Sequence, residues 1–237
     1  MLWTGWGAVV ARKRNIWDSL VRRIYYKYFS QNILYELQIR ARNEAADYVQ
    51  QFMSDAIIFE SHRDIIKFAL DNCPKHENYL EFGVATGRSI NIIASFLPPE
   101  SKVFGFDVFD GLPDNWAGHI RAKGMFKQKR LPKVPSNVVL IQGLFEDTLP
   151  AFKKNMEGNI SFCHVDCDLY ASTKTILDII GDKLVSGSCV LFDEYFNYPA
   201  WRQHEWKAWK EFCDNRGLNY QYLGFSANGG SVLIAVL

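Results

Sequence analysis

Short apolar runs alternate with segments of helical periodicity from about residue 60 to the end of the chain. Five runs are mainly apolar, without the alternation of a half-exposed strand, and they predict buried strands at residues 79–82, 103–106, 138–141, 160–165 and 189–192. Apolar positions with helical spacing predict helices at residues 65–70, 89–96, 148–155, 172–180 and 201–215. This alternation predicts an α/β fold with helices on both faces of a parallel sheet.

The C-terminal part of the chain breaks this alternation. Two strand-like runs at residues 220–224 and 231–236 are joined by the turn sequence SANGG at residues 226–230. We therefore expect a mostly parallel, seven-stranded sheet that ends in an antiparallel hairpin.

The first 59 residues predict a helical extension, which precedes a single domain over residues 60–237. Ile16, Leu20, Val21, Ile24 and Tyr28 form one apolar stripe. Residues 1–40 carry seven basic and two acidic side chains, a net charge of +5, and the rest of the chain is −4. We expect these helices to pack in a homodimer or higher homo-oligomer. The alternative is that their basic face rests on an anionic membrane surface.

Composition narrows the class of protein. The net charge of +1 argues against a general nucleic-acid binder, and 48% apolar residues suffice for a large core. The five cysteines are odd in number and lie mostly in apolar runs, so we expect reduced, structural thiols in a cytoplasmic protein. The first ten residues lack the basic start and long apolar run of a signal peptide.

A glycine-containing turn follows the first predicted strand of the domain. Gly83 and Gly87 lie between that strand and a helix, where glycine permits close backbone approach and the helix start offers free amides. Asp107 ends the next strand about 20 residues later, the position of an acid that binds ribose hydroxyls. The pattern predicts a nucleotide-cofactor site.

The spacing and charge of this turn favour one cofactor class. A dinucleotide site prefers the GxGxxG spacing, whereas this turn is GxxxG and carries the carboxylate of Glu81. A carboxylate repels phosphate but suits an ammonium group, which favours S-adenosylmethionine. A nicotinamide-dependent oxidoreductase is the alternative, because a glycine turn followed by an acid is also a dinucleotide signal.

Acidic residues follow two further predicted strands. Asp166 comes after one strand, and Asp193 and Glu194 come after the next. Carboxyl ends of parallel strands meet at one edge of the sheet, so these oxygens predict a Mg²⁺ site. Asp168 is expected to cap the following helix, given Ser172 and Thr173 just beyond it.

Two more features point to catalysis. His204 follows the second acidic strand end and is the candidate general base, with Asp166 as the other. The long polar connection at residues 110–135 predicts a lid, and its basic side chains suggest an acidic acceptor.

Four motifs, in this order, resemble the macrocin O-methyltransferase-like family of class I methyltransferases. They are FDVFDGLP at residues 106–113, GLFEDTLP at 143–150, HVDCDLY at 164–170 and VLFDE at 190–194. The resemblance covers about residues 60–237. It implies a Rossmann-like class I methyltransferase fold, S-adenosylmethionine with Mg²⁺ or another divalent cation, and O-methylation of a sugar or other diol-bearing small molecule.

The resemblance also implies roles for individual residues. Those implied to contact the cofactor are Glu81, Gly83, Gly87, Ser89, Asp107, Val108, Glu146 and Asp166, and the implied metal ligands are Asp166, Asp193 and Glu194. Family members commonly carry Asp or Asn where this chain has Glu194, and catechol-type relatives carry a lysine base where it has Leu169. A non-catalytic scaffold on the same fold, with an N-terminus that binds a partner or membrane, is the second alternative.

Overall fold

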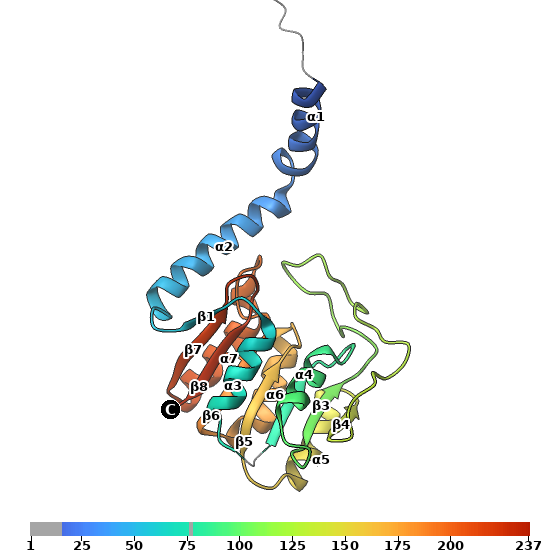
Figure 1. Ribbon diagram of the computed structural model, residues 1–237, viewed down its shortest axis with the longest axis vertical. Coiled ribbons are helices and arrows are strands. Elements are labelled where there is room, and N and C mark those ends of the chain that lie inside the picture. Colours follow the sequence, from blue (N-terminus) through green and yellow to red (C-terminus); the bar gives the residue numbers. More distant parts are fainter. Residues whose placement is uncertain (1–15, 76–77) are drawn as a thin grey trace, which may run out of the picture.

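The computed structural model describes residues 16–75 and 78–237, and it contains one eight-stranded sheet with helices on both faces (Figure 1). The strands are β1 (Ile57–Phe59), β2 (Asn78–Phe82), β3 (Val103–Asp107), β4 (Val138–Gln142), β5 (Ile160–Val165), β6 (Leu184–Phe192), β7 (Tyr220–Ser226) and β8 (Val232–Val236). Their order across the sheet is β1-β7-β8-β6-β5-β2-β3-β4.

The helices divide between the two faces, as the alternation of elements predicted. They are α3 (His62–Asn72), α4 (Arg88–Phe96), α5 (Phe145–Asn155), α6 (Tyr170–Ile180) and α7 (Glu205–Arg216), with the 3-10 turns η2 (Gly181–Lys183) and η3 (Trp201–Gln203). Apolar side chains of α3 and α4 belong to one buried cluster, and those of α5, α6 and α7 belong to the other. The two clusters lie on opposite sides of the sheet because successive strand side chains alternate in direction.

The predicted C-terminal hairpin is confirmed. Strand β8 runs antiparallel to both of its neighbours, β6 and β7, and the other pairings in the sheet are parallel. The expected number of seven strands was wrong, because β1 adds an eighth strand beside β7. Its three residues include the exposed Ile57 and Ile58, and so short a run next to a long helix carries no distinct periodic signal.

The N-terminal helices α1 (Ile16–Tyr25) and α2 (Ile33–Phe52) are linked by the π-helical turn η1 (Tyr26–Ser30). The second half of α2 packs on the domain, where Ala41, Ala45 and Tyr48 are buried and the Tyr48 ring meets Trp201 edge-on. Helix α1 instead points away from the sheet (Figure 1). The predicted extension is therefore helical, and its last part, including β1, is integrated with the domain.

The residues of α1 that belong to the predicted apolar stripe, Ile16, Leu20, Val21 and Ile24, are all exposed. The basic residues of the extension that precede residue 16 lie outside the described residues. Within residues 16–75 and 78–237, no helix combines the length and the apolar character needed to cross a membrane.

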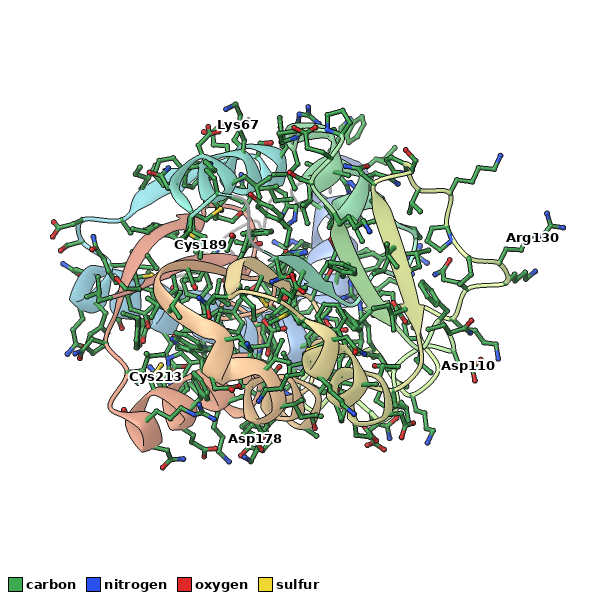
Figure 2. The ribbon with its side chains drawn as sticks, turned by 90° about the horizontal axis from the view of Figure 1, so that it is seen from below. Lys67, Asp110, Arg130, Asp178, Cys189 and Cys213 are labelled. Carbon is green, nitrogen blue, oxygen red and sulfur yellow. The ribbon has the colours of Figure 1, made fainter. Side chains whose placement is uncertain are left out.

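The predicted lid contains neither helix nor strand, but it is folded against itself and against the domain. The amides of Leu112 and Gly124 donate to the carbonyls of Met125 and Leu112, which closes a narrow loop. Trp116 is buried and anchors the lid. Figure 2 shows Arg130 extending outward from this connection.

Candidate active site

A cavity of about 680 Å³ opens at the carboxyl ends of β2, β3, β5 and β6. This is the edge at which open α/β sheets bind ligands. The cavity is lined by seven acidic residues, Asp107, Asp114, Glu146, Asp166, Asp168, Asp193 and Glu194, and by one basic residue, Arg121. Such a lining suits a cationic ligand.

Glycine is required where β2 leaves the sheet. Gly83 has a φ of 91°, and a Cβ built there would lie 1.8 Å from the carbonyl oxygen of Asp166. The absence of a side chain therefore lets the ends of β2 and β5 approach one another at the cavity. Gly87 also has a positive φ, of 80°, and precedes the first residue of α4, but it does not line the cavity.

Asp107 organises the loop that follows β2. Its Oδ2 accepts hydrogen bonds from the amides of Val84 (2.9 Å) and Ala85 (2.7 Å), and its Oδ1 accepts one from the amide of Phe109 (2.6 Å). The sequence predicted that Asp107 binds the ribose hydroxyls of the cofactor, and it gave no sign of these contacts with the loop. Asp107 also lines the cavity, beside Val108.

Glu81 and Ser89 lie behind the loop and do not line the cavity. Glu81 is fully buried, and its Oε1 accepts a hydrogen bond from the Ser89 hydroxyl at 2.8 Å. The second carboxylate oxygen lies 3.6 Å from Nδ1 of the equally buried His164. Burial raises the pKa of Glu81, which the neighbouring His164 partly offsets.

The opposite wall of the cavity comes from the turn after β4. Gly143, Leu144, Phe145 and Glu146 line it, and Glu146 lies in the first turn of α5. Val108 and Glu146, two of the residues implied to contact the cofactor, therefore border one cavity, together with apolar side chains that could cover its adenine base.

The predicted metal ligands Asp166, Asp193 and Glu194 all line this cavity. Burial, followed by the nearby carboxylate of Asp193, raises the pKa of Asp166 well above its usual range and that of Glu194 to about 8. Arg121 is the nearest positive charge, with its Nη1 4.0 Å from Oε1 of Glu194. Crowded carboxylates of this kind repel one another, and a divalent cation would relieve that repulsion.

The carboxylates of this set are not drawn together to coordination distance. Among the described residues, the one group of three or more His, Cys, Asp or Glu ligand atoms within 4.8 Å of one another is His62, His164 and Asp193. Of the predicted triad only Asp193 belongs to that group.

Asp168 belongs to the cavity, and the predicted helix-capping role was wrong. Helix α6 begins at Tyr170 after Leu169, and the N-terminus of α6 has no side-chain cap. Asp168 has a φ of 65° and is 5% exposed. Burial raises its pKa to about 7. Asp is one of the residues that tolerate this left-handed backbone.

Glu205 is a site residue that sequence reasoning missed. It is fully buried at the start of α7, and its two oxygens accept the amides of Asp168 (3.3 Å) and Glu194 (3.0 Å). One side chain thus ties together the two acidic loops after β5 and β6. The sequence shows only a glutamate in the first turn of a helix, a common feature that signals no such contact.

His204, the candidate base, does not line the cavity. It is 6% exposed, and its Nε2 lies 2.9 Å from the Ala117 carbonyl oxygen in the lid. Its ring lies near those of Trp116 and Tyr198. Burial lowers the pKa of His204. The structure therefore places this residue against the lid rather than against the acidic residues.

Comparison with known proteins agrees with this architecture. Residues 80–195, from β2 to just beyond β6, match the family model described as a methyltransferase domain. No curated protein matches the chain.

Solved structures show a similar fold. The calicheamicin methyltransferase CalS11 is 19% identical with a TM-score of 0.57, and the match covers 99% of this chain and 98% of that one. The O-methyltransferase NovP is 18% identical with a TM-score of 0.54, covering 73% and 78% of the two chains. A second CalS11 structure, described as an apo TDP-rhamnose 3'-O-methyltransferase, is 18% identical with a TM-score of 0.50, covering 92% and 91%.

The matched segment contains the glycine turn, Asp107 and both acidic strand ends, so the family model covers most of the cavity described above. The sheet order, the terminal hairpin and this match agree with the fold that the four motifs implied. Residues 80–195 are therefore a methyltransferase domain, on the class I fold that uses S-adenosylmethionine.

Proposed function

We propose that this protein is an O-methyltransferase that acts on a hydroxyl of a sugar or another diol-bearing small molecule. The observation that carries the proposal is the shared cavity: the glycine loop after β2 and the acidic ends of β5 and β6 line one space beneath the lid. A methyl donor and a hydroxyl acceptor held there would lie side by side, which is the main requirement for in-line transfer.

The cofactor would lie along the loops after β2, β3 and β4. In this proposal Gly83, Asp107, Val108 and Glu146 contact it directly, while Glu81, Gly87 and Ser89 shape the loop from behind. Asp166, which also lines the cavity, would face the methionine part. The acidic lining suits the positive sulfonium and ammonium groups.

Asp166, Asp193 and Glu194 would hold Mg²⁺, and Asp168 lines the same cavity. A bound Mg²⁺ would lower the pKa of the acceptor hydroxyl and orient it. Asp166 or Asp168 would accept the proton, because both line the cavity and the pKa of each is raised, mainly by burial. His204 would contribute by holding the lid through Ala117.

The same lining disfavours the nicotinamide alternative. A dinucleotide pyrophosphate held along the loops after β2, β3 and β4 would face the carboxylates of Asp107 and Glu146, whereas Arg121, the basic residue of the lining, belongs to the lid. Repulsion between the phosphates and these carboxylates weakens binding. Among the described residues, no lysine and no second arginine lines the cavity to offset that repulsion. The scaffold alternative is disfavoured because a protein without catalysis gains nothing from crowded, buried carboxylates that destabilise it.

Arg121 and Phe126 favour a sugar that carries a phosphate or carboxylate. They are the basic and aromatic members of the lid that line the cavity, and the Arg121 guanidinium lies 4.8 Å from the centre of the Phe126 ring. CalS11 is described as a TDP-rhamnose methyltransferase, which supports a nucleotide-linked sugar as the first acceptor to test.

Calorimetry and turnover test this proposal together. S-adenosylmethionine is expected to bind and NAD⁺ is not. A screen of nucleotide-linked sugars, free sugars and catechols should then give methylation that EDTA abolishes and Asp193→Asn reduces at least about 100-fold. The control variant Asp47→Asn, exposed on α2 and outside the cavity lining, should retain activity. Binding of S-adenosylmethionine without turnover of any acceptor would favour the scaffold reading.

The N-terminal helices would form a contact between two copies of this chain. The exposed stripe of α1 is apolar and aromatic, and such faces normally pack against a partner. Light scattering of the full chain should give a dimer that Ile24→Asp weakens. A monomer that floats with anionic vesicles would instead support the membrane alternative.

A further inference from the structure

We propose a second metal site, formed by His62, His164 and Asp193, for a transition-metal ion of the Zn²⁺ class. It is distinct from the Mg²⁺ set proposed above, although it shares Asp193, and it does not depend on the proposed reaction. The ligand atoms of these three side chains lie within 4.8 Å of one another.

Three separate elements bring these residues together. His62 is the first residue of α3, His164 lies in β5, and Asp193 follows β6. Nδ1 of His62 lies 3.3 Å from Oδ1 of Asp193, and the centres of the two imidazole rings are 5.3 Å apart. A tetrahedral ion about 2.0–2.1 Å from each ligand needs ligand atoms roughly 3.3 Å apart. The His62–Asp193 pair already has that separation.

His164 supplies the observation that points to a ligand. Its side chain is completely buried, and neither of its ring nitrogens has a hydrogen-bond partner among the described residues. Buried polar atoms without partners cost free energy and are rare in folded proteins. A metal ion bound to one nitrogen would remove this cost.

A supporting shell is already arranged around the three ligands. Oε2 of Glu81 lies 3.6 Å from Nδ1 of His164, and it too lacks a hydrogen bond. A small shift would let Nδ1 donate to Glu81, which leaves Nε2 for the metal in the usual carboxylate–histidine–metal order. Glu81 is itself held by Ser89, and Oδ1 of Asp193 accepts from the Ser231 hydroxyl at 2.9 Å.

The ligand chemistry selects the kind of ion. Two imidazoles and one carboxylate suit Zn²⁺, Co²⁺ or Ni²⁺, whereas Mg²⁺ prefers oxygen ligands. The positive charge of Arg88 near His62 would disfavour a bound cation. The carboxylates of Glu81 and Asp193, close to His164, have the opposite effect. His62 can adjust its position to close the site, because its side chain is 31% exposed at the start of a helix.

The test is zinc binding by the full chain after treatment with EDTA, measured by calorimetry in magnesium-free buffer and by metal analysis after dialysis. We expect one Zn²⁺ per chain, at least tenfold weaker binding in His62→Ala, and unchanged binding in His119→Ala, which removes a lid histidine. Co²⁺ should give the visible absorption of a tetrahedral site in the wild type and lose it in His62→Ala.

Asp166→Asn separates this site from the acidic edge, because it removes a predicted Mg²⁺ ligand and leaves all three proposed zinc ligands. It should bind Zn²⁺ as the wild type does. Zinc binding that survives His62→Ala, that disappears in Asp166→Asn, or that is absent from the wild type would overturn the proposal. His62 is the residue to change first, since substitution of the fully buried His164 would also disturb folding.

Discussion

Oδ2 of Asp107 accepts the backbone amide of Ala85 at 2.7 Å, so the acid at the end of β3 holds the loop that follows β2. The same oxygen accepts the amide of Val84, and Ala85 itself has a φ of 42°. The cofactor loop is therefore shaped before any ligand is bound. Asp107, which is proposed to bind the cofactor ribose, therefore contributes to the stability of the protein as well.

Asp107→Ala should lower the free energy of unfolding by about 1–3 kcal/mol in the absence of cofactor, because three backbone amides lose a charged acceptor. Thermal unfolding and calorimetry with S-adenosylmethionine measure the two effects. Asp47→Ala, exposed on α2 and outside the cavity lining, is the control and should change neither stability nor cofactor binding. An acid that only binds ribose would leave the stability of the unliganded Asp107→Ala variant unchanged.

Gly83→Ala should destabilise the protein by about 3 kcal/mol or more and abolish cofactor binding, since the new Cβ would lie 1.8 Å from a backbone oxygen. Gly124→Ala is a matched control. It also has a positive φ, of 81°, but a Cβ there meets nothing within 4 Å, so only the backbone cost of about 1 kcal/mol applies. Equal losses in the two variants, compared by denaturant unfolding, would contradict this account of Gly83.

Asp168→Asn should stabilise the metal-free protein at pH 8 by up to about 4 kcal/mol, or roughly 8–16 °C in Tm. Burial raises the pKa of Asp168 from 3.8 to about 7, so the folded state binds a proton that the unfolded state has lost. Stability therefore falls as the pH rises from about 4 to about 7.

The Asp168→Asn variant and the wild type should converge near pH 4, where both side chains are neutral. Asn also tolerates the φ of 65° at this position, so the backbone is not disturbed. Unfolding curves across this pH range, with and without Mg²⁺, provide the measurement. A wild type that is equally stable at pH 4 and pH 8 without metal would contradict the prediction.

Glu205→Gln should weaken Mg²⁺ binding about tenfold or more while leaving S-adenosylmethionine binding intact. The amide nitrogen of Gln cannot accept a hydrogen bond, so one of the two acidic loops loses its anchor. Glu211→Gln, on the same helix but distant from the cavity, serves as the control. Metal titration and activity measurements test this prediction. Mg²⁺ binding by Glu205→Gln that equals that of the wild type would contradict it.

His204→Ala should raise the KM for the acceptor more than it lowers kcat, because loss of the contact with Ala117 loosens the lid. His204→Gln should restore much of the activity, since its amide nitrogen can donate to the same carbonyl. A general base would behave differently: Gln could not replace it, and the acid limb of the pH–rate profile would disappear in both variants.

Local sequence was sufficient for most of the architecture. Apolar runs and helical periodicity located β2 to β8 and α3 to α7, because the buried face of each element appears as a pattern of apolar residues within one short segment. The strand-end motifs also placed Asp107, Asp166 and Asp193 at one edge, since the carboxyl ends of parallel strands meet there.

Contacts between distant parts of the chain were decided only by the tertiary structure. No local pattern distinguishes Glu205, which binds two loops, from a glutamate at any helix start, or Asp168 from a helix cap. His62 and His164 come together across 102 positions because α3 packs over the sheet face that contains His164. The sequence by itself determined the fold, the methyl donor and the acidic edge. Three-dimensional packing decided which carboxylates line the cavity, which histidines lie close together, and that His204 contacts Ala117 rather than the acidic residues.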